Sequence, residues 1–130
     1  MPHITLEYSA NLEDPLDIAA LCAVLRDAAV ASGVFAAAGI RVRAFAATHV
    51  VVADGDPAHG FVDIAVRIGA GRDTATQSRA ADEIFEAARA YTADYMARAP
   101  FMLSLELRVA AAETSRKDSS IRRYLPPELQ

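Results

Sequence analysis

The sequence predicts an α+β (α/β) fold in which a strand–helix–strand unit occurs twice in tandem, as βαβ–βαβ. Apolar and polar residues alternate at period two in residues 3–8 (HITLEY) and again in 61–68 (FVDIAVRI), as in half-buried strands. Each segment is followed by a stretch of helical periodicity and then by a second strand-like segment, within 40–52 and at 101–110. We therefore expect a four-stranded mixed sheet with two helices on one face.

The first unit covers about residues 2–52. Its helix can begin with Asp14 as N-cap and Pro15 at the first helical position, and Gly33 is placed to end it. After this helix, the run IRVRAFAATHVVV predicts a strand that is long or bent. The apolar stripe of the helix consists of Leu16, Ala20, Leu21, Val24, Leu25 and Ala28.

The second unit covers about residues 60–110 and follows a turn cluster, ADGDPAHG. Its first strand ends at a glycine-rich junction, GAGRDT, and Thr74 with Gln77 has the spacing of a capping box. The helix is expected to stop before Pro100. One face of this helix carries Ala81, Ile84, Phe85, Ala88 and Tyr91, which we interpret as core residues.

The length of 130 residues predicts a single domain, 1–130, that ends in a C-terminal arm, 111–130. The arm is polar and then becomes apolar at Ile121, Tyr124 and Leu125. Either it docks on a neighbouring subunit or it is a frayed end.

Composition excludes several classes of protein. With 53% hydrophobic and 23% charged residues, the chain is not disordered throughout, and its net charge of −4 gives no general attraction to nucleic acid or to an anionic membrane. Its one cysteine, Cys22, cannot form an internal disulfide. We find no apolar signal segment or membrane-spanning run, so we expect a cytoplasmic protein.

Pro2 stands directly behind the first methionine, at the start of the first strand. Proline donates no backbone hydrogen bond, so a strand start is one of the few sheet positions that tolerate it. A second interpretation is chemical. Removal of Met1 would leave Pro2 as a free secondary amine, and burial beside positive charge would lower the pKa of that amine toward neutral pH, where it could act as a base.

Two arginines could supply that charge. Arg41 opens the second strand, and parallel pairing of the first two strands would place it near Pro2. Arg72 follows Gly69-Ala70-Gly71 at a strand–helix junction, where small residues allow close approach of a ligand and a helix N-terminus attracts anions. Alternatively, each arginine is a solvated surface charge, and the glycines form an ordinary tight turn.

The remaining polar candidates rank lower. His3, His49 and His59 are too scattered in the sequence to show metal-ligand spacing, so we predict no metal site. Asp54 and Asp56 are first of all turn-forming residues.

Three stretches, MPHITLEYS, Gly33-Val34-Phe35 leading to AGIRVR, and FVDIAVRIGAGRD, together resemble the tautomerase superfamily, in particular its 5-carboxymethyl-2-hydroxymuconate Δ-isomerase family. The resemblance covers roughly residues 2 to 110. It implies that Pro2 is general base and then acid, and that Arg41 and Arg72 bind substrate carboxylates and stabilise the developing enolate.

The resemblance also implies a substrate and an assembly. The substrate would be a small polyanionic dienol from aromatic-acid catabolism, such as homoprotocatechuate degradation, and the product its unsaturated keto acid. No metal or organic cofactor is implied, and the protein would be a homotrimer. Two alternatives stay open: a tautomerase acting on another, phenylpyruvate-like enol or performing a dehalogenase-type hydration, and a non-catalytic trimeric module that binds a small acid.

Overall fold

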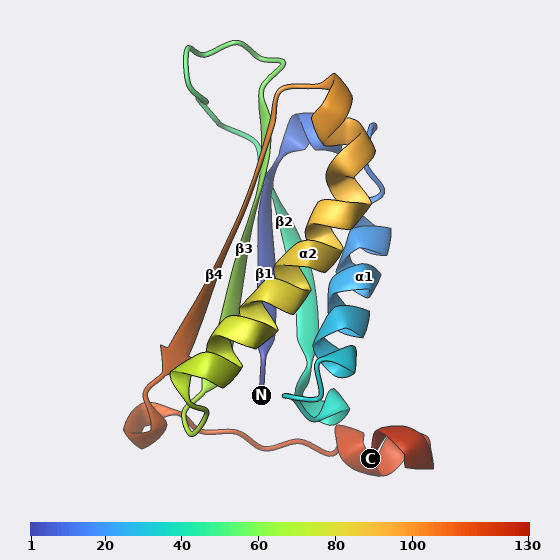
Figure 1. Ribbon diagram of the computed structural model, residues 1–130, viewed down its shortest axis with the longest axis vertical. Coiled ribbons are helices and arrows are strands. Elements are labelled where there is room, and N and C mark those ends of the chain that lie inside the picture. The colour runs from blue at the N-terminus through green and yellow to red at the C-terminus, as the bar shows by residue number, and fades with distance from the viewer.

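The computed structural model describes residues 1–130 and contains the two predicted strand–helix–strand units (Figure 1). The main elements are β1 (His3–Ser9), α1 (Ile18–Ala31), β2 (Arg41–Ala47), β3 (Gly60–Gly69), α2 (Thr74–Arg98) and β4 (Phe101–Ala110). Short 3₁₀ turns lie between β1 and α1 and between α1 and β2, and three more make up half of the C-terminal arm.

The four strands form one mixed sheet in the order β2-β1-β3-β4. Within each unit the two strands are parallel, β1 with β2 and β3 with β4, while the central pair β1 and β3 is antiparallel. Both helices cover the same face of the sheet, as predicted (Figure 1). None of the helices combines the length and the apolar character needed to cross a membrane.

The core lies between the sheet and the two helices. Alternate residues of β1 and β3 point into it, beginning with Ile4 and Leu6 on β1 and with Val62 and Ile64 on β3. The intervening residues of both strands therefore point to the opposite face, which the helices leave uncovered. From the helices, the core receives Leu21, Leu25 and Ala29 of α1 and Ala80, Ile84 and Ala88 of α2.

Both helix starts differ from the prediction. Asp17, not Asp14, caps α1, and its Oδ1 accepts a hydrogen bond from the Ala20 amide at 3.0 Å. The preceding residues instead form a turn that buries Leu12 and Leu16. On α2 the cap is Asp73 rather than Thr74, because the Asp73 carboxylate accepts from the Thr76 amide at 2.8 Å.

The second strand is also shorter than predicted. β2 ends at Ala47, and residues 48–52, which the sequence placed in a long or bent strand, belong to the loop that leads to β3. The reason is the partner strand: β1 ends at Ser9, which lies opposite Ala47, so the edge strand has no pairing partner beyond this point.

Candidate active site

Pro2 and Arg41 lie side by side at one end of the sheet, where β1 and β2 begin. The Arg41 amide donates a hydrogen bond to the Pro2 carbonyl at 3.1 Å, and the next pair in the register is His3 with Arg41. This confirms that parallel pairing brings Arg41 to Pro2. The contact is made by the backbone of Arg41, so its side chain is free for other partners.

Pro2 is one of the fully buried residues of the protein. The residue in front of it, Met1, is half-buried and lies against Gly39. A Cβ atom at Gly39 would come within 2.8 Å of the Met1 side chain and 3.2 Å of its Cα, so any other residue there would force Met1 to shift. The start of the chain is thus partly enclosed, with Pro2 buried and Met1 half-buried.

A cavity of about 660 Å³ opens around Met1 at this end of the sheet. Its walls come from the first residues of β1 and β2, the last residues of β3 and β4, and the segment that follows β4. The basic lining residues are His3, Arg41, Arg67, Arg116 and Lys117, and the only acidic one is Asp118. Such an excess of basic groups in a concave site favours an anionic ligand.

The same positive charge acts on the amino group of the chain. Burial lowers the pKa of the Met1 amine below its ordinary value of 8.0, and repulsion from Lys117, Arg72 and Arg41 lowers it further. An amine at this place therefore loses its proton more easily than one at the end of a flexible chain. That is the property that a base working near neutral pH needs.

His3 lies between two arginines. Its Nε2 is 2.9 Å from Nη1 of Arg41, and its Nδ1 is 3.4 Å from Nη1 of Arg43. Burial lowers the pKa of His3 first, and the charges of Arg67, Arg41 and Arg43 lower it further. A neutral imidazole can accept the Arg41 hydrogen bond through Nε2, so His3 holds the Arg41 side chain at the cavity wall.

Arg72 lies at the β3–α2 junction, beside the cavity but outside its lining residues. Its Nε and Nη2 donate to the Val34 carbonyl at 3.3 and 3.2 Å, and its Nη1 donates to the Gly69 carbonyl at 3.4 Å. The guanidinium also lies over the Phe35 ring, 5.2 Å from its centre. Arg72 thus ties the junction to the segment after α1, while its charge acts on the N-terminal amine.

Three basic residues of the cavity are absent from the sequence-based set: Arg67, Arg116 and Lys117. Arg67 lies opposite His3 in the antiparallel β1–β3 pair, a register that alternation alone does not specify. The alternation of apolar and polar residues does place Arg67 on the face opposite to Ile68, and from the sequence this pattern indicated that Arg67 points away from the core. Arg116 and Lys117 follow β4 and reach the cavity only through the course of the arm.

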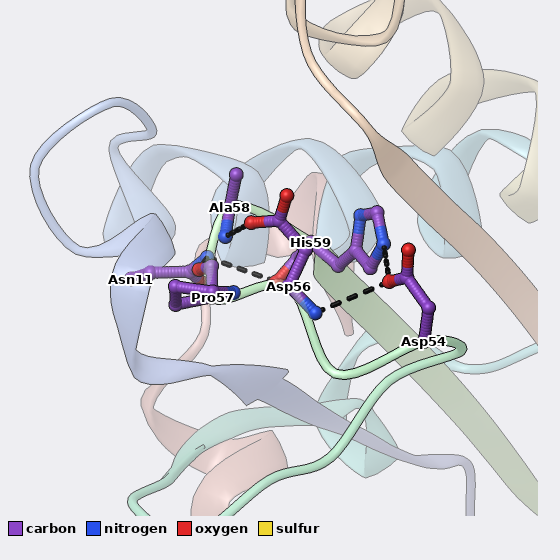
Figure 2. Close-up of polar contacts among 6 residues, drawn as sticks. All are labelled: Asn11, Asp54, Asp56, Pro57, Ala58 and His59. Atoms are coloured by element: carbon purple, nitrogen blue, oxygen red, sulfur yellow. Dashed lines mark hydrogen bonds and ion pairs between the residues drawn. The ribbon is translucent and has the colours of Figure 1, made fainter.

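The loop between β2 and β3 lies at the other end of the sheet (Figure 1). Figure 2 shows that its polar residues form hydrogen bonds within the loop and with Asn11. Nε2 of His59 is 2.7 Å from Oδ1 of Asp54, and the Asn11 side chain donates to the carbonyls of Pro57 and His59 at 3.2 and 3.0 Å. The side chains of Asp54 and Asp56 also accept hydrogen bonds from backbone amides, as is typical of turn-forming residues. No three His, Cys, Asp or Glu side chains gather into a group that could hold a metal ion.

The similarity to known proteins extends over most of the chain. Residues 2–125 match the sequence family described as 5-carboxymethyl-2-hydroxymuconate isomerase. The chain is 32% identical over 107 residues to the 5-carboxymethyl-2-hydroxymuconate Delta-isomerase of Escherichia coli, a match that covers 82% of this chain and 85% of the relative.

Solved structures agree with the sequence match. A 5-carboxymethyl-2-hydroxymuconate isomerase from Deinococcus radiodurans R1 superposes with a TM-score of 0.87 at 32% identity, over 96% of this chain and 95% of the other. A second structure, a 5-carboxymethyl-2-hydroxymuconate delta-isomerase, gives 0.87 at 33% identity over 95% and 92%. At 21% identity, a fused 4-OT described as a symmetric trimer shares the fold, with a TM-score of 0.56 over 82% and 85%.

Proposed function

Because the chain belongs to the 5-carboxymethyl-2-hydroxymuconate isomerase family, a family of tautomerase-fold isomerases, we propose that its substrate is 5-carboxymethyl-2-hydroxymuconate and that Pro2 moves the proton. The observation that carries this proposal is the cavity at the N-terminus, whose lining has four arginine or lysine side chains and one carboxylate. A substrate with several carboxylates is the kind of molecule that such a cavity attracts.

The proposed chemistry needs only one proton and one base. After removal of Met1, the neutral Pro2 amine accepts the proton of the dienol hydroxyl, and the electron pair moves along the conjugated chain. The protonated amine then returns the proton to the far carbon of the diene, which gives the unsaturated keto acid. The product is an isomer of the substrate, and no redox partner takes part.

Arg41 and Arg72 have different parts in this proposal. The Arg41 side chain lies on the cavity wall, where it can bind a carboxylate or the oxygen that becomes negative as the hydroxyl loses its proton. The charge of Arg72 lowers the pKa of the Met1 amine, and we expect it to act in the same way on the Pro2 amine. It can also bind a substrate carboxylate if its guanidinium exchanges its contacts with the Val34 and Gly69 carbonyls for that carboxylate.

We also propose that the protein assembles as a homotrimer in the cytoplasm. The sheet face opposite the helices is uncovered in one chain, and it exposes Phe45 by 55% and Met102 by 61%. Burying such side chains against another copy is favourable. The fused 4-OT of the same fold, described as a symmetric trimer, supports this assembly.

The test is an assay of protein whose intact mass shows that it begins at Pro2. We expect it to accelerate the decay of the dienol ultraviolet absorbance of 5-carboxymethyl-2-hydroxymuconate far above the uncatalysed rate. Acceleration of a phenylpyruvate-like enol alone would replace the proposed substrate. Binding of small carboxylates without any turnover would instead identify a non-catalytic module.

The pH dependence of kcat/KM gives a second prediction. Only the neutral amine accepts a proton, so the rate should rise with pH through the pKa of the Pro2 amine and then level off. Since burial and neighbouring cations lower the pKa of the Met1 amine at this end of the sheet, we expect the same surroundings to lower the pKa of the Pro2 amine. The midpoint should then lie below the pKa of the same amine in an unfolded chain. Titration of a ¹⁵N-labelled Pro2 in folded and in urea-unfolded protein measures both values, and a higher midpoint in the folded protein would contradict the proposal.

A further inference from the structure

The C-terminal segment that leaves β4 passes across the N-terminal end of the sheet. In Figure 1 this segment runs below the start of β1 before it reaches the final 3₁₀ turns. Residues 114–118 all line the cavity, together with Ala112, and they share it with Met1 and His3. We call residues 112–118 the cavity strap. The strap thus contributes six of the fourteen residues that line the cavity.

The two cations of the strap differ in what they bind. Nη1 of Arg116 donates to the carbonyls of Glu113 and Ser115 at 2.8 and 3.1 Å, so this guanidinium closes the turn of the strap itself. The ammonium of Lys117 has no hydrogen-bond or ion-pair partner in the structure. The neighbouring carboxylate of Asp118 accepts the Ser119 amide at 2.8 Å. Lys117 is therefore the strap cation that is free to bind an anion.

Lys117 lines the same cavity as the first residue of the chain. Among the charges that lower the pKa of the N-terminal amine, Lys117 has the largest effect, ahead of Arg72 and Arg41. Lys117 approaches from the strap, whereas Arg41 approaches from β2, so the two cations belong to different walls of one cavity. A ligand between them would meet a positive group on each side.

We propose that Lys117 determines substrate specificity by binding a carboxylate other than the one held by Arg41. The strap then selects molecules with two or more carboxylates over monocarboxylates. This inference rests on the proposed function for the identity of the substrate, but the binding it describes is independent of turnover. It gives the arm a role within its own chain, in addition to the two alternatives that the sequence left open.

The sequence offers an unusually direct probe, because Lys117 is the only lysine among the 130 residues. Protein labelled with lysine that carries ¹³C only at Cε therefore gives a single side-chain ¹³C NMR signal. Tricarballylate, a saturated tricarboxylate that cannot tautomerise, should shift this signal on binding, and butyrate at the same concentration should leave it unchanged. A signal that responds equally to both compounds, or to neither, would overturn the inference.

Substitution provides the kinetic test. A hydrogen bond between charged groups contributes enough to predict that Lys117→Gln raises KM for the polyanionic dienol about ten- to hundredfold. The same variant should change KM for a phenylpyruvate-like monocarboxylate enol less than about twofold, and Lys117→Arg should restore most of the loss. Arg122→Gln, which removes one charge from the same arm outside this cavity, is the matched control.

The two proposals fail in different ways. If the wild-type protein isomerises the dienol and Lys117→Gln has an unchanged KM, the inference about the strap is wrong and the proposed function stands. If tricarballylate shifts the Lys117 signal and binds more weakly to Lys117→Gln, but the dienol is not turned over, the strap inference stands and the proposed function is wrong. An equal KM increase in Arg122→Gln would show that only the overall charge of the arm matters, and this also overturns the inference.

Discussion

Protein that keeps Met1 is expected to be about 10²- to 10⁴-fold less active toward the dienol than the same protein beginning at Pro2, the range that a positioned acid–base group contributes. With Met1 attached, the Pro2 nitrogen is part of an amide and has no basic electron pair. Met1 also lies within the cavity that the substrate must enter. Both effects disappear when the methionine is removed.

The two forms can be made by producing the chain with and without additional methionine aminopeptidase and identifying each by intact mass. Their melting temperatures should be similar, because proline donates no hydrogen bond to the sheet and its burial involves the ring. Pro2→Ala, which leaves a primary amine after methionine removal, should have intermediate activity. Equal kcat/KM for the two wild-type forms would remove Pro2 from the mechanism.

The fold was predictable because its strands alternate so regularly. Every second residue of β3 is buried from Gly60 to Ile68, and this pattern is readable from the sequence. The errors lie at the ends of elements, where contacts distant in sequence decide. Leu12 and Leu16 are held in the core and delay the start of α1, and β2 stops where its partner β1 stops. Neither contact can be found in the local pattern.

The site was predictable only in part, for the same reason. That Arg41 lies beside Pro2 follows from one assumption, the parallel pairing of β1 and β2. The positions of Arg67 and Lys117 depend on the antiparallel register of β1 with β3 and on the path of the arm, and no sequence motif marks either. Arg72 stands at the predicted junction, but its hydrogen bonds to the Val34 carbonyl required the fold. The catalytic roles of Pro2, Arg41 and Arg72 stay predictions.

Arg41→Gln is expected to lower kcat/KM about 10²- to 10³-fold, which corresponds to roughly 2.7–4 kcal/mol of transition-state stabilisation lost with one donor at a developing charge. The fold should survive, because the backbone amide of Arg41, rather than its side chain, pairs with Pro2. Arg43→Gln is the matched control. Arg43 lies two residues along the same strand face and also contacts His3, but it does not line the cavity.

The pH profile separates a role in the reaction from a role in structure. Arg41 is one of the charges that lower the pKa of the Met1 amine, and we expect it to lower the pKa of the Pro2 amine as well. The rise of kcat/KM should therefore move to higher pH in Arg41→Gln. In Arg72→Gln the same shift should be accompanied by a lower melting temperature, because its contacts with Val34, Gly69 and Phe35 are lost as well. If Arg41→Gln and Arg43→Gln lose equal activity with unchanged pH profiles, the substrate is attracted by the general charge of the sheet face, and Arg41 binds no particular oxygen. A large loss confined to Arg41, with its shifted profile, is the result that assigns this side chain to the reacting end of the substrate.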